Sequence, residues 1–118
     1  MQERSFALNE PDETFSVIRD DDINRAYRYL KAMSHPLRLR ILCVLGEGEL
    51  CVGDLVDLIG TSQSNISQHL SILHDKGMLI SRKEANRVYY RIADPGILRL
   101  IGVMHEVFCT KAPASGNG

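Results

Sequence analysis

Long apolar runs are missing from this sequence. No stretch approaches the roughly 20 consecutive apolar residues that a membrane-spanning helix needs. Residues 1–19 contain neither a basic start nor a continuous apolar segment, which a secretory signal requires. We therefore expect a cytoplasmic protein that makes no contact with a membrane.

Cysteine is scarce as well, with only Cys43, Cys51 and Cys109 along the chain. Cysteines so few and so widely spaced do not form a disulfide framework, and the reducing cytosol disfavours permanent bridges. The sequence also lacks a Cys-x-x-Cys pair, a βαβ pattern, a glycine-rich phosphate loop and a His/Asp constellation around a cysteine. These absences exclude a thiol oxidoreductase and predict a protein that is not an enzyme and holds no cofactor.

A net positive charge, the usual mark of a nucleic-acid binder, is missing from the total, which is −1. The charge is distributed unevenly, however. Residues 1–22 hold seven acids and two bases, residues 23–45 hold five bases and no acid, and residues 62–92 hold five bases and two acids. Two basic segments therefore follow an acidic one, and contact with phosphate needs only a local basic surface.

The size and composition predict one compact domain. With 118 residues, 44% of them apolar, the chain is long enough for one core and too short for two. Residues 1–20 are acidic and lack apolar periodicity, which predicts a mobile arm. Residues 111–118 are mostly small and polar, which predicts a disordered tail. The folded domain is expected to span residues 21–110.

Helical periodicity recurs through this domain. Apolar residues at spacings of three and four predict five helices, over residues 22–34, 36–45, 52–59, 62–74 and 95–109. Pro36 and Pro95 suit the first turns of the second and last helices. Gly60 closes the third helix and Ser62 opens the fourth at once, which is the helix-turn-helix arrangement.

After Gly77 the pattern changes to short β-prone runs. Residues 78–82 and 88–92 flank a polar tip at residues 83–87, which predicts a β-hairpin. Five helices and one hairpin in this order predict a mainly α fold with a small β-hairpin, the winged helix-turn-helix.

The helix predicted over residues 62–74 has two unlike faces. Ile66, Leu70 and Leu73 form an apolar face that docks on the domain, whereas the opposite face is polar. Gln and Asn pair bidentately with adenine, and Ser bonds to several bases. We predict that this helix reads double-stranded operator DNA through six side chains: Gln63, Ser64, Asn65, Ser67, Gln68 and His69. Any amphipathic surface helix shows a polar face, but the glycine turn before it and the hairpin after it favour DNA.

The predicted hairpin adds basic side chains. Arg82, Lys83 and Arg87 are expected to contact phosphate or to enter a minor groove. Such contacts supply affinity with little sequence information. Exposed basic residues are usually only solvated, so each assignment stands against that simpler alternative.

The last predicted helix has a broad apolar face. Its members are Ile97, Leu98, Leu100, Ile101, Met104, Val107 and Phe108. This face is wider than packing against so small a domain requires. Part of it is therefore expected to bury against a second copy of the chain.

Four segments together resemble the ArsR/SmtB family of bacterial regulators: LKAMSHPLRLRIL (30–42), ELCVGDL (49–55), SQSNISQHLSILHDKGML (62–79) and RVYYRI (87–92). The resemblance implies a homodimer built from the first and last helices. It further implies a repressor that binds a palindromic operator and is released by an inducer.

Metal-sensing members of that family carry the form ELCVCDL, in which the second cysteine corresponds to Gly53 here. Their zinc site in the last helix expects Asp-x-His, where this chain has Asp-Pro-Gly at residues 94–96. Both metal patterns therefore fail, and no metal ligands are assigned. A metal- or metalloid-responsive repressor remains an alternative, because His105 and Cys109 are four residues apart and an ion could join them to Cys51.

Two cysteines stand out on physical grounds. Cys51 lies at the predicted N-cap of the third helix, where the helix dipole favours the reactive thiolate, although Asp54 opposes it. Cys109 ends the last helix. Cys43, between apolar neighbours on the second helix, is interpreted as a structural core residue.

The placement of Cys51 and Cys109 is similar to the sulfane-sulfur-responsive branch of the family, the SqrR and BigR type. This resemblance implies a Cys51–Cys109 dithiol switch that a persulfide or polysulfide inducer bridges, in control of sulfur oxidation or sulfide detoxification genes. The alternatives are a general redox-responsive repressor and two unrelated thiols.

Overall fold

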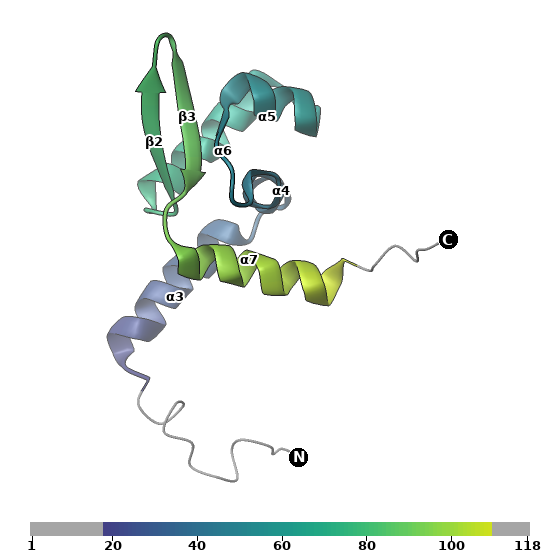
Figure 1. Cartoon of the computed structure of the whole chain (residues 1–118). Coiled ribbons are helices and arrows are strands. Elements are labelled where there is room, and N and C mark those ends of the chain that lie inside the picture. Colours follow the sequence, from purple (N-terminus) through teal and green to yellow (C-terminus); the bar gives the residue numbers. More distant parts are fainter. Residues whose placement is uncertain (1–17, 110–118) are drawn as a thin grey trace, which may run out of the picture.

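The computed structural model describes residues 18–109, so most of the predicted arm and all of the predicted tail lie outside it. The elements, labelled as in Figure 1, are α3 (Asp20–Met33), α4 (Pro36–Leu45), β1 (Leu50–Cys51), α5 (Val52–Ile59), α6 (Gln63–Asp75), β2 (Leu79–Glu84), β3 (Arg87–Ile92) and α7 (Pro95–Phe108). The predicted winged helix-turn-helix fold, with five helices and a hairpin, is confirmed within these residues. No helix among them is long and apolar enough to cross a membrane.

The helix ends follow local sequence signals. His35 Nδ1, Ser62 Oγ and Asp94 Oδ1 each accept a backbone N–H in the first turn of the helix they precede, at 3.0–3.1 Å. Gly60 ends α5 in the left-handed region at φ +88°, which lets α6 begin three residues later. α3 begins at Asp20, two residues before the predicted start.

The strand β1 was not predicted. It pairs with β3, which makes a three-stranded antiparallel sheet of order β1-β3-β2 in place of an isolated hairpin. Leu50 lies opposite Tyr90, and Cys51 lies opposite Tyr89. Cys51 is therefore joined through backbone hydrogen bonds to the base of the wing.

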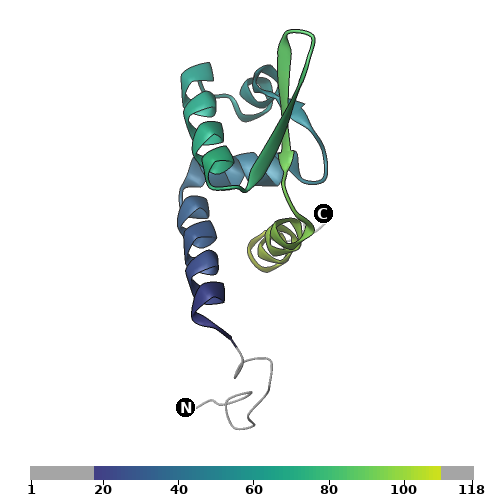
Figure 2. The ribbon, with the colours of Figure 1, turned by 90° about the vertical axis from the view of Figure 1, so that its left-hand side faces the viewer.

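The core is built where α4, α5 and α6 meet, and its most deeply buried side chains include Leu42, Leu55 and Ile66. Figures 1 and 2 show the hairpin at one end of the molecule and α3 and α7 at the other. The fold thus separates a helix-turn-helix and wing from a pair of outer helices.

Candidate nucleic-acid interface

α6 presents the two faces that its sequence predicts. Its apolar residues Ile66, Leu70 and Leu73 are at most 1% exposed. Five of the predicted base-reading residues are exposed: Gln63, Ser64, Asn65, Ser67 and Gln68. None of these carries a negative charge, so the face is chemically suited to a DNA groove.

The first turn of α6 is fixed by side-chain hydrogen bonds. Ser62 Oγ accepts the Asn65 N–H at 3.1 Å and caps the helix. The Asn65 amide donates to Thr61 Oγ1 at 3.0 Å, which orients the amide and leaves its carbonyl oxygen and one N–H for other partners. The positive end of the helix dipole lies at this same exposed turn, where it favours phosphate.

His69 differs from the other predicted base readers because it is half-buried. Its Nδ1 lies 3.1 Å from Nη1 of Arg38, and its ring packs on that of His35 with centroids 4.3 Å apart. Burial, followed by the charges of His35 and Arg38, lowers the pKa of His69. One ring nitrogen of His69, Nδ1, thus already has a partner inside the protein.

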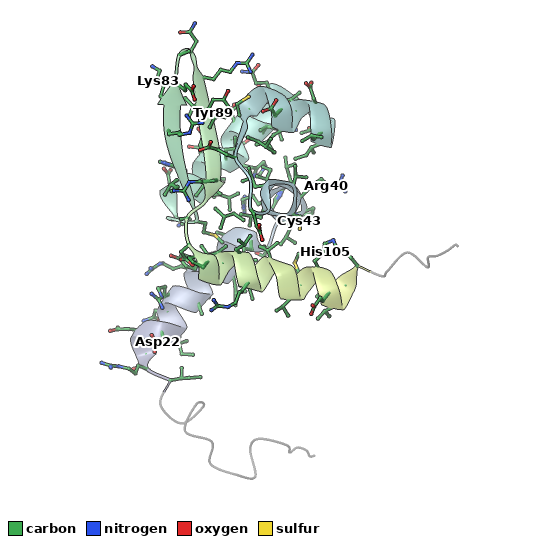
Figure 3. All side chains as sticks on the ribbon, viewed as in Figure 1. Asp22, Arg40, Cys43, Lys83, Tyr89 and His105 are labelled. Atoms are coloured by element: carbon green, nitrogen blue, oxygen red, sulfur yellow. The ribbon has the colours of Figure 1, made fainter. Side chains whose placement is uncertain are left out.

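The wing ends in a two-residue turn, Ala85 and Asn86, with Ala85 at φ +56°. Two-residue hairpin turns need a positive φ in their first half, which explains this conformation in a residue that rarely adopts it. Lys83, labelled in Figure 3, and Arg87 lie near the turn and are exposed, as phosphate contacts require.

Arg82 is engaged by carboxylates within the wing region. Its Nε and Nη2 pair with the two oxygens of Glu49 at 2.8 Å, and its Nη1 lies 2.6 Å from Oε1 of Glu84. The guanidinium also lies over the Tyr89 ring, 4.8 Å from its centroid. The bond from Arg82 lowers the pKa of Glu49, and both carboxylates raise the pKa of Arg82. Among the cations predicted to contact phosphate, Arg82 is the one already paired in this way.

Glu49→Gln is expected to strengthen binding to any duplex by about two- to fivefold at low salt, the size of one exposed ion pair. The substitution removes the charge that holds Arg82, so its guanidinium becomes available to phosphate. Anisotropy titration of a labelled random-sequence duplex measures the gain, which should fade between about 50 and 200 mM salt. In a variant that also carries Arg82→Gln the gain in affinity should be much smaller. An equal gain there would show that the release of Arg82 is not its cause.

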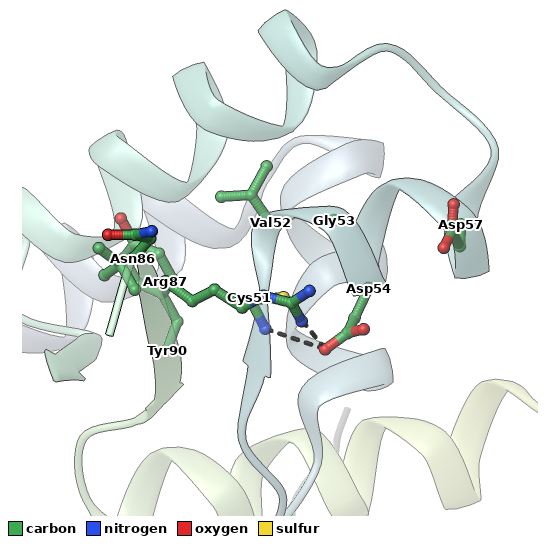
Figure 4. A pocket seen from close by; sticks show the side chains of 9 residues that line it. Cys51, Val52, Gly53, Asp54, Asp57, Asn86, Arg87 and Tyr90 are labelled. Atoms are coloured by element: carbon green, nitrogen blue, oxygen red, sulfur yellow. Dashed lines mark hydrogen bonds between the residues drawn. The ribbon is translucent and has the colours of Figure 1, made fainter. Parts of the chain in front are cut away.

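Cys51 lies between the start of α5 and β3 (Figure 4). It is 6% exposed, and its thiol donates to Asp54 Oδ2 at 3.2 Å, which also accepts its backbone N–H at 3.3 Å. Cys51 and Asp54 line a cavity of about 480 Å³, together with Gly53 and Arg87. Tyr89, followed by the charge of Cys51, raises the pKa of Arg87. The predicted N-cap position of Cys51 is confirmed.

Cys109 ends α7 and is exposed. α7 packs against α4, and Cys43 lies on α4 in the same region as His105 (Figure 3). Burial and then the charge of Cys109 raise the pKa of the Cys43 thiol. α7 thus packs on the helix that carries Cys43, and the charge of Cys109 acts on this thiol, which the sequence assigned to the core. Cys51, its predicted partner, lies against the wing.

The metal site considered as an alternative is not assembled. Within residues 18–109, no group of three or more His, Cys, Asp or Glu side chains is placed to hold a metal ion. Cys51 instead lines the cavity beside the wing, together with Asp54 and Arg87.

Two residues of this region were missed by sequence reasoning in the roles that they take here, Arg38 and Glu49, whereas Cys43 packs against the core as the sequence predicts. Arg38 carried a usable signal, because it is a charged residue between the apolar positions of α4. Glu49 carried none, since its partner Arg82 lies on a different strand and is distant in sequence.

A family model described as bacterial regulatory protein, arsR family, matches residues 35–81. The biofilm growth-associated repressor of Xylella fastidiosa (strain Temecula1) is 35% identical over 88 residues, which cover 75% of this chain and 77% of the relative. The transcriptional activator HlyU of Vibrio cholerae is 40% identical over 85 residues, covering 72% and 79% respectively.

Solved structures agree with these relatives. HlyU from Vibrio cholerae superposes with a TM-score of 0.75 at 37% identity, covering 78% of this chain and all of that one. The transcriptional repressor BigR from Xylella fastidiosa superposes with a TM-score of 0.71 at 32% identity, covering 80% and 100%. The matched proteins are transcriptional regulators, which agrees with the prediction that the chain is not an enzyme. On its fold and these matches, the chain belongs to the arsR family of DNA-binding bacterial regulatory proteins.

Proposed function

We propose that the chain is a homodimeric repressor that reads a palindromic operator with α6 and releases it when reactive sulfur bridges two of its cysteines. The observation that carries the DNA-reading part is the exposed, acid-free polar face of α6 beside a wing with exposed cations. Repression is proposed by analogy with the Xylella relatives, which are named as repressors.

Gln68→Ala is expected to weaken binding to a specific duplex by about 1–3 kcal/mol, the size of one base contact, and to affect a scrambled duplex much less. Arg87→Ala should weaken both duplexes about equally, because a phosphate contact carries no sequence information. The specific probe is a duplex that the protein itself selects from a random library, and anisotropy gives both affinities. An unchanged preference in Gln68→Ala would place the reading face elsewhere.

Dimerisation is supported by two outer helices with exposed apolar side chains. Those of α3 and α7 are 42–78% exposed: Ile23, Tyr27, Leu30, Leu100, Val103, Val107 and Phe108. A groove of about 540 Å³ runs between the two helices and is lined by Leu30, Ile97 and Leu100. Apolar surface of this extent marks an association site, and a second copy of the chain offers a matching surface.

For the switch, two observations support Cys43 as the partner of Cys109: α7 packs on α4, and the charge of Cys109 acts on the Cys43 thiol. Cys109 is the exposed thiol and is expected to react first. Its thiolate attacks a sulfane sulfur of a polysulfide and becomes a persulfide, while the shortened polysulfide leaves. The second thiolate then attacks the Cys109 sulfur and expels hydrosulfide, which leaves a disulfide. Two thiols are oxidised, and one sulfane sulfur is reduced to sulfide.

Cys51 fits a reacting role less well. Its thiol is buried and donates a hydrogen bond to Asp54, so an inducer has limited access to the Cys51 sulfur. It remains the second candidate partner of Cys109, because the cavity beside it gives a route from solvent.

Peptide mass spectrometry after polysulfide treatment distinguishes the pairs. Trypsin leaves Cys43 and Cys51 in one peptide, because residues 44–50 contain no lysine or arginine. Cleavage after Glu47 and Glu49 separates them. A Cys43–Cys109 cross-link is the expected product. A Cys51–Cys109 cross-link would instead support the pairing predicted from sequence. If Cys109 forms no cross-link at all, the switch is removed from the proposal.

A further inference from the structure

A compact cluster of nitrogen-rich side chains lies where α3, α4 and α6 meet. Arg38 of α4 donates from Nε to the Ala32 carbonyl in the last turn of α3, and its Nη1 reaches Nδ1 of His69 on α6 at 3.1 Å. His35 packs its ring on His69. One guanidinium thus joins an outer helix to the reading helix.

The contacts define which nitrogens carry protons. Arginine has five N–H donors and no acceptor, so His69 Nδ1 must accept from it and bears no proton. His35 Nδ1 accepts the Leu37 N–H at 3.1 Å, so this nitrogen also bears none. Each of these hydrogen bonds therefore requires a histidine ring whose Nδ1 carries no proton. Protonating Nδ1 of His69 would place two cations in contact and break the link.

We infer that His69 is a positioning residue for DNA recognition, acting through Arg38 to hold α6 in its reading position, and that acid weakens operator recognition by protonating it. The inference rests on α6 being the reading helix. It replaces the base contact predicted for His69 with an internal role, since its Nδ1 is bonded to Arg38 and the residue is half-buried.

The direction of the pH effect follows from the surroundings of His69. Burial, then His35 at the N-cap of α4, then Arg38 on α4 lower the pKa of His69. Among the described residues, α3, α5 and β2 also pack on α6 and add no charge that shifts His69. In the unfolded chain this histidine has its ordinary pKa of about 6.5, so it binds a proton more readily there than in the folded chain. Native-state stability from this group is full above that pH and declines as the pH falls below it.

Acid has an opposing general effect, because added positive charge strengthens attraction to any phosphate backbone. Affinity for one duplex therefore mixes the two effects. The ratio of affinities for the selected duplex and a scrambled duplex of equal length and composition isolates recognition. This ratio is the quantity to follow.

The test compares His69→Asn and His69→Leu in the full chain. Asn places an oxygen near the position of Nδ1, so it accepts from Arg38 but does not titrate, whereas Leu offers no acceptor. From about pH 7.5 to 5.5 the wild-type ratio should fall by about fivefold or more, the range typical of coupling between two sites. His69→Asn should match the wild type at the higher pH and stay nearly constant. His69→Leu should be low at both.

His105→Asn on α7 is the matched control, since His105 is exposed and away from the cluster. It should keep the wild-type pH profile. An equal loss of the ratio in acid for His69→Asn and wild type overturns the inference, as does a normal ratio for His69→Leu. Circular dichroism at each pH separates loss of recognition from unfolding. If Gln68→Ala does not change the ratio, the reading-helix premise fails, whatever the His69 variants show.

Discussion

Cys109→Ser should bind the selected duplex like the reduced wild type and lose all release by polysulfide. The wild type should lose about 5- to 150-fold in affinity on treatment, the range typical of coupling between two sites. Serine keeps the size and polarity of the exposed thiol, so the helix end and the fold should be unaffected. Anisotropy before and after treatment, with reductant added last, measures release and its reversal.

The two other cysteines provide the controls. Cys43→Ser should also abolish release, because it removes the α4 thiol that is proposed as the partner of Cys109. Cys51→Ser should retain release, since Cys51 lies against the wing and bonds to Asp54. The opposite pattern, with release lost in Cys51→Ser and kept in Cys43→Ser, favours the pairing predicted from sequence. Release that persists in Cys109→Ser contradicts every form of the proposed switch.

A bridge between Cys43 and Cys109 would act on the arrangement of helices. Cys43 lies on α4, which packs against α6, and Cys109 lies at the end of an outer helix that is expected to pair the subunits. Joining the two would couple the spacing of the paired reading helices to thiol chemistry. None of the predicted base-contacting residues would be touched.

The sequence predicts the helix-turn-helix within one or two residues because its signals are local. Gly60 supplies the left-handed residue and Ser62 the cap, and both act on backbone within a few positions. The apolar face of α6 is equally local, because helical periodicity alone determines which of its side chains share a face.

The remaining features depend on contacts distant in sequence. β1 has only two residues and no alternation to reveal it, and it forms because Leu50 reaches Tyr90 across the sheet. The ion pair of Arg82 with Glu49 depends on that same sheet. Periodicity placed Cys43 in an apolar stripe, but the effect of Cys109 on its thiol depends on the packing of α7 on α4.

In the proposed dimer, the pairing of two reading helices depends on the outer helices. Val103→Glu on α7 is expected to convert the dimer to a monomer and to weaken binding to the selected duplex by at least about a hundredfold. Val103 is 54% exposed in the single chain, so the charge can be solvated there without disturbing the core. In a dimer it would be buried against apolar side chains, which is costly for an unpaired carboxylate. A monomer also loses the second half-site, whose tethered contact contributes about 10²- to 10⁴-fold.

Sedimentation velocity over a range of concentrations measures the oligomeric state directly. Leu58→Glu on α5 is a suitable control, because it introduces the same charge at a side chain that is 64% exposed and lies outside both outer helices. This variant should remain dimeric. If Val103→Glu also sediments as a dimer, or if Leu58→Glu dissociates, the α3 and α7 surface is not the interface. A monomeric Val103→Glu that still binds the selected duplex tightly would show that one reading helix is sufficient.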